Sequence, residues 1–166
     1  MPEAGPDAAK KWAVIDLDGV VADTRHRLHF VERQPKNWEG FFAAARHDPV
    51  LPEGVAVVER LAPDHRIVYL TGRPERWRSD TEHWLSAVGL PDGPVHMRGN
   101  ADHRPARMVK LGVLRKLVTK APVAIVVDDD PQVVHAVRSA GFTVLHADWM
   151  SDQPALFEAQ EVDGAT

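Results

Sequence analysis

Two aspartates separated by one residue follow a short apolar run near the start of the chain. The run covers residues 12–15, and Asp16, Leu17, Asp18 and Gly19 come directly after it. Such a run, rich in β-branched residues, predicts a strand that is buried on both faces. Asp-Gly alone is ordinary turn chemistry at a strand end that reaches solvent. Beside a bound cation, the two carboxylates could instead serve as a nucleophile and as a proton donor and acceptor.

Three later segments supply the other groups that phosphoryl transfer needs. One apolar run ends at Thr71, another ends at Asp128 and Asp129, and Lys110 lies between them. A hydroxyl and an ammonium group suit the phosphoryl oxygens, where charge redistributes in the transition state. Carboxylates are ligands that Mg²⁺ prefers, and adjacent buried acids repel each other unless a cation is present. We therefore expect an Mg²⁺ site that includes Asp16 and the later acidic pair.

A parallel sheet would bring these segments together, because the carboxyl ends of its strands share one edge, where ligands bind. Apolar runs alternate with helical patterns along the chain, so the predicted fold is a doubly wound α/β domain. The expected strands are residues 11–17, 66–70, 95–97, 122–127 and 142–145. The expected helices are residues 35–47, 52–62, 75–88, the segment around 110–118, residues 131–140 and residues 154–160.

The length of 166 residues fits one domain. We expect a disordered leader at residues 1–10, the domain at residues 11–147 and a polar C-terminal tail at residues 148–166. The chain has no cysteine, which excludes disulfides, and we expect a cytoplasmic protein. No apolar run approaches the roughly 18 residues that a membrane span needs. The net charge of -4 argues against a broadly basic nucleic-acid surface, so any polyanion contact must be local.

Neither gap between the candidate segments has room for a large lid domain. An uncovered site favours bulky or polymeric phosphorylated substrates over small metabolites. The polar stretch at residues 23–28 is expected to form a loop over the site, where Arg25 and Arg27 are either solvated charges or phosphate clamps. The aromatic stripe at Trp38, Phe41 and Phe42 is expected to form core or a dock for this loop.

The four segments, in this order, resemble the haloacid dehalogenase (HAD) superfamily over about residues 11–147. Its first motif, DxDG, corresponds to Asp16 and Asp18, and the later motifs correspond to the threonine, the lysine and the acidic pair. The resemblance implies a Rossmann-like core with only a minimal cap, Mg²⁺ and an aspartyl-phosphate mechanism. It implies Asp16 as nucleophile and Asp18 as acid and then base. The implied catalytic set is Asp16, Asp18, Thr71 and Lys110, and the implied metal set is Asp16, Asp18, Asp128 and Asp129.

Within the superfamily, the chain is similar to the 3'-phosphatase domain of polynucleotide kinase-phosphatases. That family carries an arginine after the nucleophile loop, a Gly-Arg pair after the second motif and arginines before the third. The matching residues here, implied to contact substrate, are Arg27, Gly72, Arg73, Arg98 and Arg104. Ala106 stands where the family pattern has an acidic residue. The kinase motif G-x-x-x-x-G-K-[ST] is not in the sequence.

The resemblance implies removal of 3'-phosphates from DNA or RNA ends, beside a separate kinase or ligase. A 5'(3')-nucleotidase or another small-molecule phosphatase would use the same chemistry. A phosphate-binding module that has lost turnover is the alternative from a different functional class.

Overall fold

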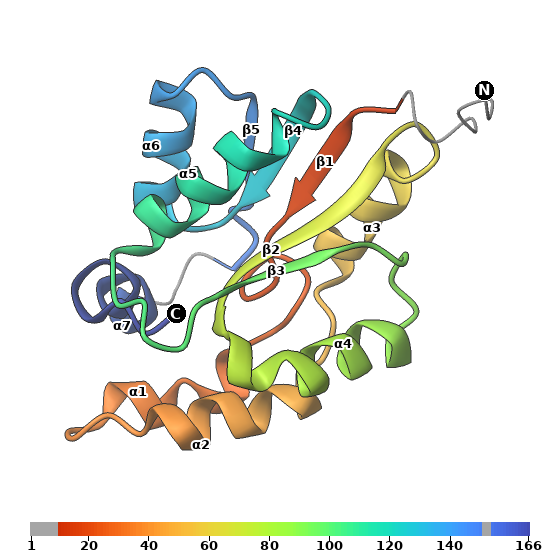
Figure 1. The fold of residues 1–166 in the computed structure, drawn as a ribbon. Helices are drawn as coiled ribbons and strands as arrows, with labels where there is room; N and C mark the ends of the chain where they lie inside the picture. Colours follow the sequence, from red (N-terminus) through yellow and green to blue (C-terminus); the bar gives the residue numbers. More distant parts are fainter. Residues whose placement is uncertain (1–9, 151–153) are drawn as a thin grey trace.

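Five parallel strands form a single sheet in the order β3-β2-β1-β4-β5 (Figure 1). The computed structural model describes residues 10–150 and 154–166, so the expected leader lies almost wholly outside the described residues. The strands are β1 (Trp12–Ile15), β2 (Arg66–Pro74), β3 (Val95–Arg98), β4 (Val123–Asp128) and β5 (Val144–His146). The central position of β1 places the residues after it between the ends of β2 and β4. The predicted doubly wound parallel sheet is confirmed.

Four helices cover the two faces of this sheet. They are α3 (Pro52–Leu61), α4 (Arg78–Ala87), α5 (Ala106–Leu117) and α6 (Pro131–Ser139). Successive side chains of a strand point to opposite faces. On β1, Ile15 accordingly packs in the apolar cluster that includes α3 and α4 residues, whereas Val14 packs in the cluster that includes α5 and α6 residues. Both clusters hold β1 rigidly, and this fixes the position of Asp16 and Asp18, which follow it.

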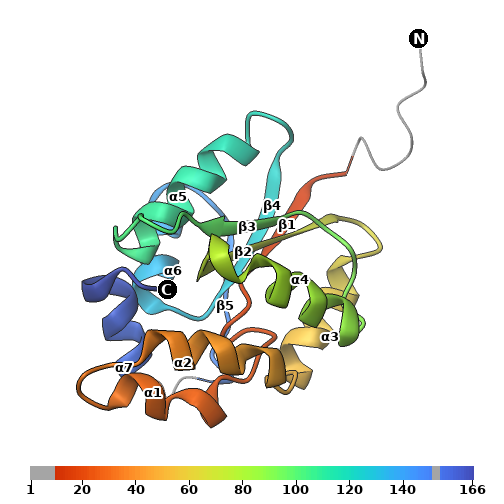
Figure 2. The ribbon, with the colours of Figure 1, turned by 60° about the horizontal axis from the view of Figure 1, so that its bottom comes forward.

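Shorter helices lie across the carboxyl edge of the sheet (Figures 1 and 2). Between β1 and α3 come α1 (His29–Glu32) and α2 (Trp38–Ala43), and near the end of the chain comes α7 (Pro154–Glu158), followed by a π-helical segment over Ala159–Asp163. The aromatic stripe predicted at Trp38, Phe41 and Phe42 packs against α1 and α7 in a third apolar cluster. Its buried members are Leu28, Val31, Phe41, Phe42 and Leu156. This small layer is the minimal cap.

The segment after residue 147, expected to be a polar tail, is folded onto the domain from residue 154 onwards. Leu156, Ala159 and Thr166 are buried. The reason is that Leu156 completes the apolar cluster of the cap, a contact distant in sequence that helical spacing does not reveal. β2 is also longer than expected, because Pro74 at its end still pairs with Arg98 of β3 after an irregularity in register.

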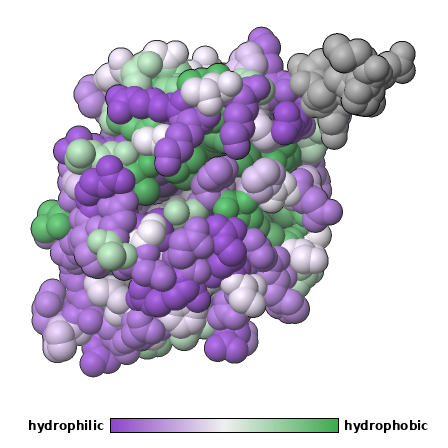
Figure 3. Space-filling view, in the orientation of Figure 1, coloured by the Kyte–Doolittle hydropathy of each residue, from purple (hydrophilic) through white to green (hydrophobic). Residues whose placement is uncertain are grey.

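The face of the molecule shown in Figure 3 is mostly hydrophilic, with apolar residues exposed in smaller patches. Large exposed apolar side chains among the described residues include Met108 and Val118. No helix in the described part of the chain is long and apolar enough to cross a membrane.

Candidate active site

Asp16 stands directly after β1, at the carboxyl edge of the sheet. Its backbone N–H donates to the carbonyl of Val127 in β4 at 3.0 Å, and its Oδ1 accepts from the N–H of Leu17 at 2.8 Å. Gly19 has a φ of 79°, a left-handed conformation that glycine adopts without a Cβ clash. The chain folds back there, and the N–H of Ala22 donates to the carbonyl of Leu17 at 2.9 Å. This tight turn fixes both Asp16 and Asp18.

Three carboxylates meet at this edge around one ammonium group. Oxygens of Asp16, Asp128 and Asp129 all lie within 4.8 Å of one another, and all three residues are buried. Lys110 Nζ lies 2.6 Å from Asp128 Oδ2 and 3.2 Å from Asp16 Oδ1. Burial raises the pKa of Asp16 to about 7, and the charge of Asp128 adds to that effect. Burial also raises the pKa of Asp129 well above its ordinary value, again with help from neighbouring carboxylates.

The donor set of this cluster fits a divalent cation. Asp16 Oδ2 is buried and has no hydrogen-bond partner, although burying an unsatisfied carboxylate oxygen is costly. The single charge of Lys110 cannot neutralise three carboxylates. Oxygen donors of this kind suit Mg²⁺, a hard cation that is commonly held by one or two carboxylates together with phosphate oxygens. The residues Asp16, Asp128 and Asp129 therefore have the chemistry to hold it.

Asp18 lies in a different electrostatic environment from Asp16, although only one residue separates them. Its carboxylate accepts from Arg27 Nη2 at 2.8 Å and from Arg73 Nε at 3.1 Å. Burial alone would raise the pKa of Asp18, but the charges of Arg73 and then Arg27 lower it below its usual range. Asp18 is thus ionised at neutral pH in this state, and its carboxylate lies outside the three-carboxylate cluster.

Asp48 completes this ion-pair network and was not found from the sequence. Its side chain is fully buried and accepts from Arg27 Nε at 2.7 Å and from Arg73 Nη2 at 3.2 Å. His26 Nε2 lies 2.6 Å from Asp48 Oδ1. Both arginines are therefore held between two carboxylates. In the sequence Asp48 precedes Pro49, a pattern that indicates only a turn.

The polar stretch at residues 23–28 was expected to form a loop over the site, but Arg27 within it belongs to the core. The side chain of Arg27 is fully buried, and its guanidinium lies 4.2 Å from the centre of the Phe41 ring. Its burial is possible because Asp18 and Asp48 both neutralise it. Arg25, by contrast, is exposed and pairs with Asp23, as a solvated surface charge does.

Thr71 and Gly72 lie within β2, beside the C-terminal segment. Thr71 is buried, and its Oγ1 accepts from the N–H of Arg73 at 3.2 Å. A Cβ built on Gly72 would lie only 2.2 Å from the carbonyl carbon of Thr166. Only glycine allows the backbone of the C-terminal segment to approach β2 this closely.

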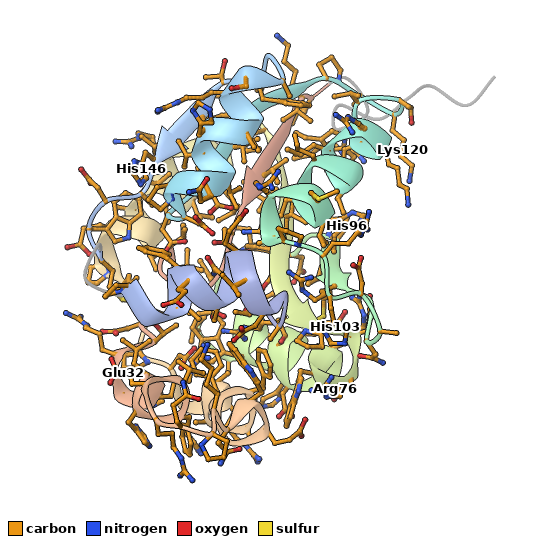
Figure 4. All side chains as sticks on the ribbon, turned by 90° about the vertical axis from the view of Figure 1, so that its left-hand side faces the viewer. Glu32, Arg76, His96, His103, Lys120 and His146 are labelled. Carbon is orange, nitrogen blue, oxygen red and sulfur yellow. The ribbon has the colours of Figure 1, made fainter. Side chains whose placement is uncertain are left out.

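The two arginines before Lys110 differ in their surroundings. Arg98 is buried and donates to four backbone carbonyls, among them Gly72 at 3.2 Å and Thr166 at 3.1 Å. Arg104 is exposed and donates through Nε to Asp102 at 3.0 Å. Arg98 therefore lies at the margin of the site, whereas Arg104 faces solvent. Figure 4 views this side of the molecule, with α7 and the π-helical segment in front of the sheet edge and His103 to one side.

A family model for the phosphatase domain of polynucleotide kinase (PNKP) matches residues 10–149. The chain belongs to this family. No curated protein sequence matches it. The resemblance inferred from the motifs is therefore confirmed at the level of the family, and the PNKP phosphatase family is a phosphohydrolase family of the HAD type.

Solved structures similar to this PNKP-type domain share its fold. A chain in the structure of the Pnkp1/Rnl/Hen1 RNA repair complex is 22% identical, with a TM-score of 0.69 over 86% of this chain, which spans only 44% of that chain. A haloacid dehalogenase-like hydrolase from Streptococcus pneumoniae is 14% identical, with a TM-score of 0.62, covering 93% of this chain and 92% of that one. The putative HAD hydrolase YfnB from Bacillus subtilis, bound to magnesium, is 8% identical, with a TM-score of 0.59, covering 87% of this chain and 92% of that one.

Ala106, which stands where the family resemblance implies an acidic residue, is the first residue of α5. Ala106 is buried in the apolar cluster between α5, α6 and the sheet. Lys110, one helical turn further on, points to the carboxylates. The substitution therefore leaves an apolar contact at the start of α5 in place of an acid, while the lysine keeps its two carboxylate partners.

Proposed function

We propose that this PNKP-type domain is an Mg²⁺-dependent phosphomonoesterase that removes 3'-phosphates from polynucleotide ends through an aspartyl-phosphate. The observation that carries the proposal is the cluster of Asp16, Asp128 and Asp129 around Lys110 at the end of the central strand. Asp16 Oδ2 is a buried carboxylate oxygen that lacks a hydrogen-bond partner. That oxygen is available to attack phosphorus.

The proposed reaction has two steps. In the first, a bond forms between an Asp16 oxygen and phosphorus, the ester P–O bond breaks, and the leaving oxygen takes a proton from Asp18. In the second, water attacks phosphorus, Asp18 takes its proton, and the Asp16 carboxylate is regenerated as phosphate leaves. Lys110 and Thr71 bind the phosphoryl oxygens. Mg²⁺, held by the three clustered carboxylates, would neutralise the negative charge that opposes the approach of the phosphate.

Asp18 needs a proton in the first step, although it is ionised in this state. A phosphate dianion that binds beside Asp18 competes with it for Arg73 and Arg27. Because these arginines are what lowers the pKa of Asp18, weaker pairing with them raises that pKa again. We infer that substrate binding itself returns Asp18 toward the range that a general acid requires.

The polynucleotide substrate is proposed from the family and from one structural relative. The family model describes the phosphatase domain of a polynucleotide kinase, and Pnkp1 was solved in an RNA repair complex. These support a DNA or RNA 3' end as substrate and a separate kinase or ligase as partner. The open alternative within the same chemistry is a mononucleotide.

Phosphate release tests the proposal, with Mg²⁺ and with EDTA. The substrates are a 3'-phosphorylated oligonucleotide, a 5'-phosphorylated oligonucleotide and the 3'- and 5'-mononucleotides, and Asp16→Asn is the control. We expect Mg²⁺-dependent release, fastest from the 3'-phosphorylated oligonucleotide, and none from Asp16→Asn. Hydrolysis that survives this substitution would contradict the mechanism. Preference for a mononucleotide would retain the mechanism and reject the polymer.

Salt dependence separates the two substrate classes further. A polynucleotide end that is bound through several backbone phosphates releases counterions, so its KM should rise with salt more steeply than that of a mononucleotide. Equal dependence on salt for the two substrates would count against contacts beyond the terminal phosphate.

A further inference from the structure

The catalytic candidates are closed off from solvent in this structure. Only 4% of Asp16, 1% of Thr71 and 2% of Lys110 is exposed. A phosphate ester must nevertheless reach the Asp16 carboxylate. Some part of the structure must therefore move before substrate can bind, and the contacts around the site indicate which part moves at the lowest cost.

The end of the C-terminal segment lies over the phosphate-binding side of the site. The backbone of Thr166 rests against Gly72, the residue directly after Thr71, and a Cβ on Gly72 would lie 2.2 Å from the carbonyl carbon of Thr166. The carbonyl oxygen of Thr166 accepts from Arg98 Nη2 at 3.1 Å. Thr166 itself is buried. This segment thus occupies the space beside two residues that are proposed to contact substrate, Gly72 and Arg98.

The ion pairs that join residues 161–166 to the rest of the domain are partly exposed. Lys36 Nζ pairs with Asp163 Oδ2 at 2.6 Å, and Arg107 Nε pairs with Glu161 Oε1 at 2.9 Å, and all four side chains keep 20–40% of their exposure. Water and salt weaken such pairs. Leu156 of α7, by contrast, is fully buried in the cap cluster. Ala159 and Gln160 are buried as well, so residues 161–166 are the part that can separate from the domain while α7 stays anchored.

Residues 25–47 of the cap are the other part of the structure over the site, and they are held more firmly. Arg27 forms fully buried ion pairs with Asp18 and Asp48. Trp84 of α4 also donates to the carbonyl of Asp48 at 2.9 Å. Lifting the cap would separate buried charges, which is strongly unfavourable. The comparison favours movement of the C-terminal segment.

We propose that residues 161–166 form a displaceable strap that closes the active site until a phosphorylated end replaces it. The strap gives Arg98 Nη2 one backbone oxygen of Thr166, whereas a phosphate dianion offers the guanidinium several oxygens and a bidentate pairing. Binding of the phosphorylated end thus provides the interaction that displaces the strap. This inference rests on the proposed function, because it assumes that the site accepts a phosphate ester.

A reversible bridge between the strap and the cap tests this inference. The chain has no cysteine, so the double variant Lys36→Cys with Asp163→Cys contains only the two introduced thiols. They replace the ion pair that joins the residues just before α2 to the strap. Ethanediyl bismethanethiosulfonate bridges the thiols, and dithiothreitol removes the bridge. The control is Arg78→Cys with Glu82→Cys, across an exposed ion pair within α4. Two quantities are measured, kcat/KM for the 3'-phosphorylated oligonucleotide and the Kd of inorganic phosphate by calorimetry.

We expect the bridge to weaken phosphate binding and kcat/KM by at least about tenfold, because it removes the open fraction of molecules. Dithiothreitol should restore both quantities, and the α4 control should change neither. Equal phosphate affinity with and without the bridge would overturn the strap. So would a reduced variant that binds no phosphate, since release of the strap would then open no anion site. A bridge that controls phosphate binding in a protein without oligonucleotide hydrolysis would retain the strap and reject the proposed function.

Discussion

Two aspartates one residue apart have opposite electrostatic environments. Asp16 lies among carboxylates, and burial raises its pKa to about 7, whereas Arg73 and Arg27 overcome burial and lower the pKa of Asp18. The difference arises from the neighbours of each carboxylate, because Asp128 and Asp129 lie beside Asp16, whereas Arg27 and Arg73 bind Asp18. One side of the turn is thereby suited to a cation and the other to proton transfer beside two guanidinium groups. This division of roles is what the proposed two-step reaction needs.

Asp48 is predicted to act through the two arginines. Asp48→Asn keeps the shape of the side chain but removes the charge that holds Arg27 and Arg73 in place. Breaking a buried ion pair should lower the free energy of unfolding by about 3 kcal/mol, measured by urea denaturation. Displaced arginines should also lower kcat/KM by about 100-fold.

The control for this prediction is His26→Gln. His26 also contacts Asp48, but its side chain is 36% exposed and it contributes no charge to Asp18 directly. We expect kcat/KM of His26→Gln to stay near the wild-type value. If Asp48→Asn shifts stability without changing the pH profile of kcat, Asp48 is only structural, because altered pairing changes the pKa of Asp18 and must move a limb of that profile.

The sequence predicted the carboxylates and the lysine of the site but not the network around Asp18. Asp16, Asp128 and Lys110 carry a signal because each follows or faces the end of an apolar run. Asp48 has none, since an acid before proline is common in turns. The burial of Arg27 was missed for the same reason, because its partners become apparent only when residues far apart in the sequence are brought together.

At the scale of elements, the order of strands and helices was predictable because each has a hydrophobic period of its own. The role of the last segment was not. Its helix was expected, but Leu156 packs against the cap and Thr166 against β2, and these contacts depend on the three-dimensional arrangement. Local patterns specify what a segment forms, whereas the surface it covers is decided by elements distant in the chain.

Two helical glycines provide a matched test of how closely α3 must approach the nucleophile turn. A Cβ on Gly54 of α3 would lie 1.8 Å from the carbonyl oxygen of Val20, whereas nothing lies within 4 Å of a Cβ on Gly112 of α5. Gly54→Ala should therefore lower the free energy of unfolding by about 1–3 kcal/mol through overpacking. Gly112→Ala should raise it by about 0.5–1 kcal/mol through helix propensity. Urea denaturation measures both, and equal effects would show that α3 can shift away from the turn.

At the scale of the whole molecule, the net charge of -4 is distributed unevenly. Three acids are concentrated at one buried edge of the sheet, and the helix that carries Lys110 contains basic but no acidic residues. The mutual repulsion of the carboxylates in the acidic cluster depends on whether a cation or a proton binds there. The charge of this cluster should therefore change the free energy of unfolding of the entire domain.

Metal removal should destabilise the domain more at alkaline than at acidic pH. The folded-state pKa of Asp16 is raised to about 7 and that of Asp130 to about 6, mainly by burial. The folded protein thus holds protons that the unfolded chain has lost, so metal-free stability falls as pH rises from about 4 to about 7. The pairs of Asp18 are complete throughout that window, since its pKa is lowered. A bound cation offsets the repulsion, and its binding competes with these protons.

The measurement is the Tm in Mg²⁺ minus the Tm in EDTA, at about pH 5.5 and about pH 8. With Mg²⁺ at about 100 times its Kd, the gain of about 2.7 kcal/mol should raise Tm by about 8 °C at the higher pH. The difference should be much smaller at the lower pH, where Asp16 binds a proton instead. Groups remote from the cluster, such as His96, change the Tm in Mg²⁺ and the Tm in EDTA equally. Their effect therefore cancels in the difference. Asp128→Asn should abolish the shift, and an equal shift at both pH values would mean that the cation does not bind at Asp16.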